Sequence, residues 1–247
     1  MFHHVVPAEN LGALAPFAVS RDLFTRQLDR LQHSGFETIT LEELFYARQG
    51  KGRGRDVAKP VVITFDDCAS DLLTYAVPEL RRRGMTATFF AVSGKLGGDN
   101  DWDAGQGSPK IPLMTGDDLR HLAGEGFEIG SHGMSHANLR QSPPEQIRRE
   151  LCDSRLMLEK TTGRSVRFFA YPYGEYPQGY ARYCREAGYD GAVSIFSRAP
   201  TVTSDPYCLR RVLIHEGDRG MRFRFKLSRL YQRLRVHVDR RVLKGVA

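Results

Sequence analysis

The stretch VVITFDD, residues 61–67, carries the pattern that decides the fold class. Its first five residues form a short and largely apolar run, typical of a strand that is buried on both faces of a parallel sheet. Two acids, Asp66 and Asp67, follow directly. Parallel strands need crossover connections, which are usually helices, so this stretch predicts an α/β fold with polar side chains at a strand end.

Strand and helix signals alternate on both sides of this stretch. Ser20 is a predicted helix cap, and Thr40 with Glu43 forms a predicted capping box. We expect helices at 21–34, 41–48, 70–83, 116–124, 143–161 (capped by Ser142) and 178–187, and strands at 36–39, 61–65, 86–91, 127–130, 166–171, 189–195 and 209–214. Repeated strand–helix units predict a mainly parallel sheet, either open and doubly wound or closed as a barrel.

Length and composition are those of an ordinary globular chain. The 247 residues are 41% hydrophobic and 26% charged, which suits one large α/β domain or two small ones. No apolar run approaches the roughly 18 residues of a membrane-spanning helix, and the first residues do not resemble a secretory signal. Four scattered cysteines indicate reduced thiols and no cysteine-only metal site. We therefore expect a chain that stays in the cytoplasm.

The net charge of +7 comes from the C-terminal end of the chain. Of 36 basic and 29 acidic residues, nine basic and one acidic lie in residues 221–247, which leaves 27 basic and 28 acidic residues elsewhere. A nearly neutral body argues against a protein that binds nucleic acid over its whole surface.

Polar residues follow several of the predicted strands. Asp66 and Asp67 follow one strand, and His132 and His136 follow another, four residues apart from each other. Each group by itself has an ordinary structural interpretation, the acids as helix caps and the histidines as surface residues. Because parallel strands place their carboxyl ends at one edge, a carboxylate and two imidazoles can meet there and hold a catalytic Zn²⁺ or a similar divalent ion.

Three motifs at these positions resemble those of the NodB-type polysaccharide deacetylases, carbohydrate esterase family 4. They are TFDD at 64–67, SHGMSH at 131–136 and FAYPYG at 169–174. The last resembles the branch that includes poly-N-acetylglucosamine deacetylases. The resemblance implies an irregular (β/α) barrel of about seven parallel strands, to which we assign residues 1–220. The basic composition of residues 221–247 sets this segment apart as a C-terminal tail.

The resemblance also implies an activity and a set of residue roles. The expected reaction is metal-dependent hydrolysis of the N-acetyl group of an amino sugar, in a polysaccharide or lipid-linked glycan, as part of exopolysaccharide biosynthesis. The ion is expected to be Zn²⁺, with Co²⁺, Ni²⁺ or Mn²⁺ as substitutes. The implied roles are Asp66 as general base, Asp67, His132 and His136 as metal ligands, the Tyr173 backbone N–H as oxyanion donor, and His215 as general acid. Tyr171, Pro172 and Trp102 are candidate substrate contacts.

The sequence departs from the family pattern at three places. Cys68 stands where the family usually has Gly, and we interpret it as a small residue that fills the space. Ala170 stands where many members have an Arg that orients the base, and we expect Arg211 to take over that role. The motif that supports the acidic histidine is not recognisable, so His3 competes with His215 as the acid.

Alternatives remain for the function and for the tail. The chain could remove O-acetyl groups or cleave another amide, or it could be a catalytically silent carbohydrate-binding barrel. Trp102 could anchor its loop rather than stack on a sugar. Apolar residues recur at helical spacing among the arginines of the tail, namely Phe223, Leu227, Leu230, Tyr231, Leu234 and Val238. Such a helix could lie on an anionic membrane surface or pack its apolar side on the barrel.

Overall fold

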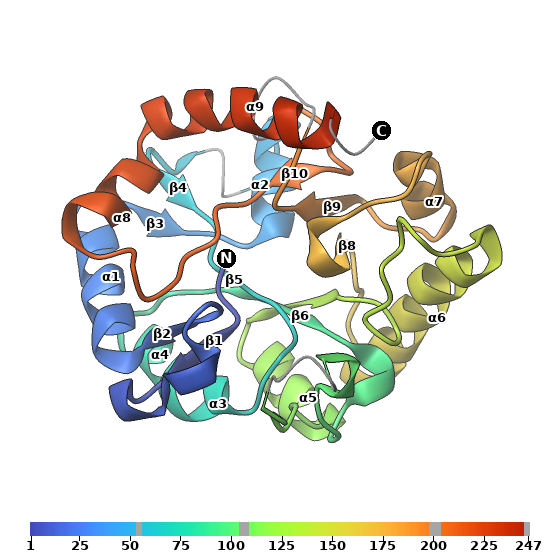
Figure 1. Ribbon diagram of the computed structural model, residues 1–247, viewed down its shortest axis with the longest axis horizontal. Coiled ribbons are helices and arrows are strands. Elements are labelled where there is room, and N and C mark those ends of the chain that lie inside the picture. Colours follow the sequence, from blue (N-terminus) through green and yellow to red (C-terminus); the bar gives the residue numbers. More distant parts are fainter. Residues whose placement is uncertain (53–55, 104–108, 198–203, 245–247) are drawn as a thin grey trace.

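A sheet of six parallel strands lies at the centre of the molecule, with helices around it (Figure 1). The computed structural model describes residues 1–52, 56–103, 109–197 and 204–244. Neighbouring strands follow the order β10-β9-β8-β7-β6-β5. Their bounds are β5 (Thr64–Phe65), β6 (Thr88–Ala91), β7 (Glu128–Ser131), β8 (Phe168–Ala170), β9 (Gly191–Ser194) and β10 (Leu209–Arg210). All five pairings are parallel, so every carboxyl end lies at the same edge.

The first two residues connect the two edges of this sheet. Phe2 forms backbone hydrogen bonds of 2.8 and 3.0 Å with the residues on either side of Phe65, and Met1 forms two of 3.0 Å with those on either side of Leu213. Both pairs have the pattern of a parallel ladder, and the N-terminal end therefore lies between β5 and the segment after β10. The irregular (β/α) barrel expected from the sequence is confirmed.

Helices and short strands surround the sheet. The helices are α1 (Arg21–His33), α2 (Leu41–Arg48), α3 (Asp71–Tyr75), α4 (Val77–Arg82), α5 (Gly116–Gly124), α6 (Pro144–Thr162), α7 (Tyr180–Glu186), α8 (Gly220–Leu227) and α9 (Arg229–Lys244). Two parallel pairs join β1 (His4–Val6) to β2 (Ala18–Ser20) and β3 (Glu37–Thr38) to β4 (Pro60–Val61). The predicted caps are confirmed: Ser20 Oγ accepts from the start of α1, and the Thr40–Glu43 capping box opens α2.

Several predicted strands are shorter than expected, and four predicted features differ more clearly. The strand expected at 61–65 divides into β4 and β5, which belong to different sheets, and the strand at 209–214 is shorter. The helix expected at 70–83 divides into α3 and α4 because Pro78 has no N–H to continue α3 and instead occupies the first turn of α4. Ser142 does not cap α6; its hydroxyl donates to the Asn138 carbonyl.

Aromatic side chains pack on both faces of the sheet, with Phe65 and Phe89 toward the surrounding helices and Phe90 and Phe168 on the other face. Phe65 and Phe89 stack at 4.9 Å between ring centroids, and each is fully buried. Burying a side chain of this size contributes about 2–3 kcal/mol to folding. On the opposite face, Gly130 of β7 makes room for the Phe90 ring, because a Cβ there would lie 2.4 Å from it. This packing holds the strand ends in fixed positions.

The basic tail forms α8 and α9, except for residues 245–247, which lie outside the described residues. One side of α9 packs on the barrel through Val236 and through a buried ion pair of 3.1 Å between Asp239 and Arg210 of β10. Packing on the barrel, one of the two expectations for the tail, therefore holds for this side of the helix. The boundary between a 1–220 domain and the tail stays a prediction.

Candidate active site

The ends of the parallel strands bring together residues far apart in the sequence. Asp66 and Asp67 follow β5, His132 follows β7, and Arg211 follows β10. His136 lies four residues beyond His132 in the same loop. Side chains from three strands therefore share one edge of the sheet, as parallel α/β folds arrange their active sites.

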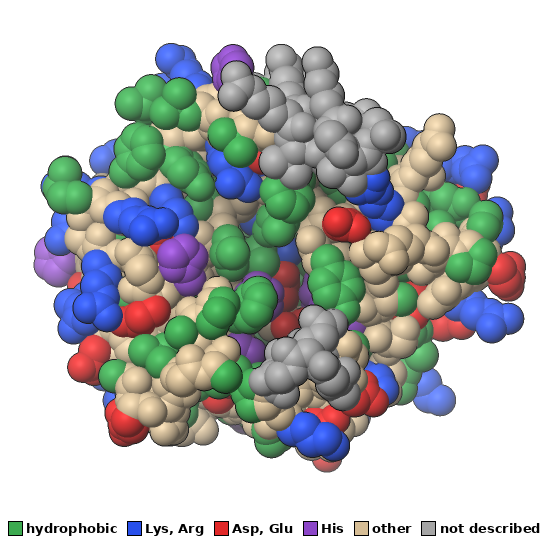
Figure 2. Space-filling model, viewed as in Figure 1, with side chains coloured by type: hydrophobic (Ala, Val, Ile, Leu, Met, Phe, Trp, Pro, Cys, Tyr) green, Lys and Arg blue, Asp and Glu red, His purple; other side chains and the backbone are tan. Residues whose placement is uncertain are grey.

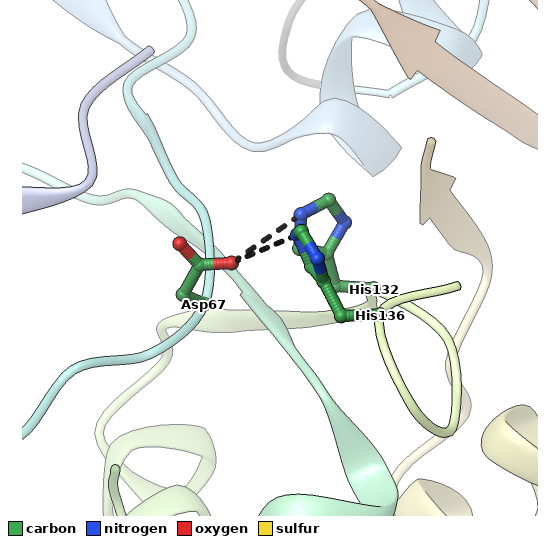
Figure 3. A group of neighbouring side chains, drawn as sticks. All are labelled: Asp67, His132 and His136. Carbon is green, nitrogen blue, oxygen red and sulfur yellow. Dashed lines mark ion pairs between the residues drawn. The ribbon is translucent and has the colours of Figure 1, made fainter. Parts of the chain in front are cut away.

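Asp67, His132 and His136 form the only group of three metal-ligating side chains found among the described residues. Figure 3 shows both imidazoles directed at the same carboxylate oxygen. Each Nε2 lies 3.5 Å from Asp67 Oδ1, and the three ligand atoms lie within 4.8 Å of one another. Ligands about 2.0–2.1 Å from a tetrahedral ion are roughly 3.4 Å apart, so the spacing suits a divalent cation.

Contacts around the two histidines turn their Nε2 atoms toward Asp67. His132 Nδ1 lies 2.7 Å from the Ala170 carbonyl, which only accepts, so the proton sits on Nδ1 and leaves Nε2 as a free ligand. The ring of His136 stacks on Trp102 at 4.6 Å and meets the edge of Tyr173 at 4.7 Å. Burial lowers the pKa of His136 to about 3, which favours the neutral imidazole that binds metal.

The residues present fit a cation. Asp67 Oδ1 is buried and has no hydrogen-bond partner among the described residues. A buried carboxylate oxygen without a partner costs free energy that a cation between it and the two imidazoles would recover. One oxygen and two nitrogens, with no fourth protein ligand in the group, are typical of a catalytic site with open positions. The three residues therefore form a candidate divalent-metal site, and the donors do not identify the metal.

Asp66 lies beside this group and is held by Arg211. The guanidinium makes a bidentate contact of 2.5 and 2.7 Å to both carboxylate oxygens, and Asp66 Oδ2 is 3.9 Å from His132 Nε2. Burial alone would raise the pKa of Asp66, but the charge and hydrogen bonds of Arg211 outweigh it and leave the pKa well below its usual range. Asp66 is therefore an ionised carboxylate next to the candidate metal site, and its role as a base stays a prediction. Arg211 contacts Asp66 directly, and its expected role in orienting a catalytic base stays a prediction.

Backbone strain is concentrated at the site. Among the described residues, the non-glycine residues with positive φ are Asp67, Cys68, His136 and Tyr173, with values of 58° to 67°. The left-handed conformation costs about 1–2 kcal/mol for a residue with a Cβ, and strain of this kind clusters at functional sites. Two of the three candidate ligands, Asp67 and His136, have this left-handed conformation, so contacts elsewhere in the fold must offset its cost.

Glu150 of α6 holds the turn that carries both histidines. Its carboxylate accepts hydrogen bonds from the backbone N–H of Met134 at 2.7 Å and of Ser135 at 3.1 Å, and from the Ser135 hydroxyl at 2.5 Å. Gly133 allows this approach, because a Cβ there would lie 2.6 Å from Glu150 Oε2. Glu150 was not among the residues predicted from the sequence. The one feature that could have indicated it is its place as a charged residue beside Ile147 and Leu151, on the apolar side of the helix.

A cavity of about 330 Å³ opens over the candidate metal site. Asp66, Asp67 and both histidines line it, and Leu14, Phe17 and Ile111 contribute apolar wall. His3 also lines it. Its buried Nδ1 has no hydrogen-bond partner among the described residues, and burial lowers its pKa. The neighbouring His4 does have a hydrogen-bond partner, because its Nδ1 lies 2.9 Å from Asp71 Oδ2. An ionised carboxylate, a candidate metal site and an imidazole thus face one cavity.

Of the other predicted site residues, some line this cavity and others do not. Tyr173 and Trp102 line it, as does Tyr171, whose hydroxyl donates to the Tyr207 carbonyl in the core. Pro172 is buried and is not among the wall residues.

The ring of His215 also does not line the cavity; it accepts from the Gly217 N–H and lies 3.5 Å from Asp218. The substrate contacts and the acid role of His215 stay predictions.

Cys68 is fully buried directly after the acidic pair. Burial, and then the charges of Asp67 and Asp66, raise the pKa of its thiol well above the usual range. The side chain is therefore a neutral thiol, in keeping with the interpretation of Cys68 as a small residue that fills space. Its φ of 58° explains why glycine suits this position.

Comparisons with known proteins agree with this geometry. The chain is 25% identical to YxkH of Bacillus subtilis strain 168, over 90% of its own length and 73% of that protein. It is 26% identical to the poly-beta-1,6-N-acetyl-D-glucosamine N-deacetylase of Staphylococcus aureus strain MRSA252, over 81% of its own length and 69% of the relative.

Solved structures share the fold. The Streptococcus pyogenes deacetylase PplD superposes with a TM-score of 0.77 at 23% identity, covering 92% of this chain and 96% of PplD. A de-N-acetylase from Aggregatibacter actinomycetemcomitans superposes with a TM-score of 0.74 at 19% identity, covering 90% and 96%. The sequence profile of the polysaccharide deacetylase family matches residues 53–192, more than half of the chain. This protein therefore belongs to the polysaccharide deacetylase family.

Proposed function

We propose that this protein hydrolyses the N-acetyl group of an amino sugar in a glycan and releases acetate. The observation that carries the proposal is the juxtaposition of Asp67, His132 and His136 with the Arg211-bound carboxylate of Asp66. Three ligands hold a cation while a second, separately ionised carboxylate remains available for a proton. A metal site and a separate proton acceptor are what hydrolysis by an activated water requires.

The residues divide the reaction as follows. A divalent ion held by Asp67, His132 and His136, most simply Zn²⁺, would polarise the acetyl carbonyl and lower the pKa of water. Asp66 accepts the proton of the attacking water, and Arg211 keeps it ionised for that purpose. The backbone N–H of Tyr173 is the proposed donor to the oxyanion, on the cavity wall beside His136.

We assign the transfer of a proton to the leaving nitrogen to His3 in place of His215. Because burial lowers the pKa of His3, its imidazole is neutral at rest, and the proton that it passes on is the one that Asp66 takes from the attacking water. An amine leaves poorly unless it is protonated, so amide cleavage needs an acid close to the base and the bound acetyl group. His3 lines the same cavity as Asp66 and Asp67, whereas His215 contacts Asp218 outside its wall. The presence of an imidazole in the cavity wall favours an amide over an ester as the substrate. An alkoxide leaves more readily than an amide anion, so an ester has less need of such an acid.

The proposed substrate class is a glycan that contains N-acetylglucosamine. The likeness to the Staphylococcus aureus N-deacetylase supports this class, and so does a cavity that is lined by apolar and aromatic side chains around a polar centre. The cavity volume suits one acetylated sugar unit. The rest of a polymer or of a lipid-linked glycan would lie outside it.

Acetate release from a panel of acetylated glycans tests the proposal. We expect release from N-acetylated substrates such as poly-β-1,6-N-acetylglucosamine, loss of activity with a chelator, and recovery with Zn²⁺, or with Co²⁺, Ni²⁺ or Mn²⁺. Release from O-acetylated substrates alone would assign an esterase. Binding of glycans without any hydrolysis, in metal-loaded protein, would assign a carbohydrate-binding barrel.

Two matched variants separate the two carboxylates. Asp66→Asn should keep the bound metal and lose most of the turnover, because it removes the base alone. Asp67→Asn should lose the metal as well, because it removes a ligand. Equal metal content and equal turnover in both variants would contradict these roles. We would compare the two variants by measuring metal content, by plasma emission spectroscopy, and turnover on the same preparations.

A further inference from the structure

The outer side of the tail helices carries an apolar strip that the barrel does not cover. The strip consists of Met221, Phe225, Leu230, Leu234 and Val238, and between 44% and 74% of each residue is exposed. These five are more than half of the nine exposed large hydrophobic residues found in the described part of the chain. The spacing of four along each helix places them on one side of α8 and on one side of α9.

The opposite side of the same helices is fixed to the barrel, so the strip is not exposed by fraying. Phe223 of α8 is buried, and the Lys226 ammonium donates to the Leu213 carbonyl at 2.8 Å and to Asp218. On α9, Asp239 is buried between Arg210 and Arg235, with ion pairs of 3.1 and 3.0 Å. The edge contact between Phe225 and Tyr231 joins the two helices.

Unpaired arginines lie beside the strip. Arg224, Arg229 and Arg233 are exposed, and no acidic side chain within the described ranges forms an ion pair with them. Figure 2 shows hydrophobic side chains gathered over α8 and the first part of α9 with basic side chains among them. The same view looks into the hollow that contains histidine and acidic side chains. The strip is therefore both apolar and strongly basic.

A basic groove between α1 and α8 extends this surface. Its volume is about 550 Å³, and its walls include Arg26, Arg30, Arg219 and Arg224. Its one acidic wall residue among those described, Asp29, is paired with Arg83 at 2.6 Å. Arg219 is paired with Glu216, so the unneutralised positive charge of the groove comes from Arg26, Arg30 and Arg224, for which no ion pair is found within the described ranges.

We propose that the apolar strip and the α1–α8 groove together form a docking surface for an anionic lipid bilayer. Apolar side chains that project between unpaired arginines can enter the headgroup boundary while the guanidinium groups meet lipid phosphates. A second copy of this chain fits less well, because pairing two such strips would bring their arginines together. No helix in the described part of the chain is long and apolar enough to cross a membrane, so docking would be peripheral.

Vesicle flotation with the full chain tests this surface. We expect the protein to float with vesicles of phosphatidylcholine and phosphatidylglycerol, not with phosphatidylcholine alone, and to be released by salt. The triple variant Arg224→Gln/Arg229→Gln/Arg233→Gln should partition roughly a hundredfold less, because each arginine contributes about a factor of five. Leu230→Ser/Leu234→Ser should lose roughly tenfold or more.

Matched controls come from exposed residues elsewhere. Arg48→Gln/Arg140→Gln/Arg164→Gln removes the same charge, and Leu156→Ser/Met157→Ser removes similar apolar surface from α6; both should float as the parent does. The proposal is overturned if the parent does not float, or if the controls lose as much binding as the tail variants. A dimer in sedimentation that Leu230→Ser/Leu234→Ser abolishes, without vesicle binding, would also overturn it and assign the strip to a second copy.

Discussion

Arg211 and Asp66 form a bidentate ion pair across 145 residues of sequence, with contacts of 2.5 and 2.7 Å between the guanidinium and both carboxylate oxygens. Arg211 also lies over the Phe90 ring at 5.3 Å, which fixes its plane. Burial by itself would favour the protonated carboxyl of the proposed base, whereas the charge of Arg211 is the largest of the contributions that lower the pKa of Asp66.

Removing this guanidinium should shift the pH dependence of the reaction. In Arg211→Gln the pKa of Asp66 rises, because burial still disfavours the charge and the guanidinium that offsets it most is gone, which leaves only the neighbouring imidazoles and the bound metal. Asp66 accepts a proton only when ionised, so the acidic limb of kcat/KM moves to higher pH and activity near pH 5 falls roughly tenfold or more. A pH profile with metal-saturated enzyme measures the shift.

Arg211→Lys serves as the control because it keeps the charge and loses the bidentate geometry. We expect its acidic limb to lie between those of the parent and of Arg211→Gln. Three superimposable profiles would mean that Arg211 does not control the ionisation of the base.

His3 and His215 are distinguished by single substitutions. His3→Gln should lower kcat on an N-acetylated substrate by roughly 10²-fold or more, the usual contribution of a general acid, and leave metal content unchanged. His215→Gln should retain most of the activity, because its ring lies outside the cavity wall. Steady-state kinetics on both proteins gives the answer, and the reverse ranking would return the acid role to His215.

Glu150 is expected to act on metal affinity without touching the metal. In Glu150→Gln the new NH₂ group faces N–H and O–H donors that the carboxylate now accepts, so the turn between His132 and His136 loosens. Supporting contacts of this kind typically change metal affinity by roughly 10–100-fold. Titration with Zn²⁺ or Co²⁺ measures the loss.

Glu145→Gln, on an exposed turn of the same helix, is the matched control for Glu150→Gln. It should bind metal as the parent does. Gly133→Ala should reproduce the defect of Glu150→Gln, since its Cβ would displace the Glu150 carboxylate. Unchanged affinity in both Glu150→Gln and Gly133→Ala would show that the turn holds its shape without this carboxylate.

The cysteines should react very unequally. Cys68, Cys184 and Cys208 are buried, and burial raises the pKa of each thiol, whereas Cys152 is half-buried at the surface of α6. We expect native protein to take up about one thiol label per chain, at Cys152. Quantitative labelling before and after denaturation tests this. Labelling of Cys68 in the folded protein would mean that solvent reaches the space behind Asp67.

Local sequence signals predicted much of the fold because each depends on a few adjacent residues. Ser20 and the Thr40–Glu43 box mark helix starts by hydrogen bonds that span only three residues, and both caps are present. The run at 61–65 was harder to interpret, since an apolar strand carries no mark of the sheet to which it belongs. Its division between β4 and β5 depends on partners that lie far away in the chain.

The site shows the same contrast. Asp67, His132 and His136 stand out in sequence because their residue types and spacing suit a metal, and the fold brings them together. Glu150 does not stand out in the same way, because its partners are backbone N–H groups, which every residue carries. Neither does the stacking of Trp102 on His136, which joins two loops that the sequence does not link.

The amino-acid order by itself determined the strand–helix alternation, the helix caps, the candidate ligands and the basic character of the tail, since each is a property of neighbouring residues. The tertiary structure decided that His3 and not His215 lines the cavity with Asp66, how Arg211 reaches Asp66, and which side of α9 is buried. These are distances between segments far apart along the chain, and only the packing of the barrel determines them.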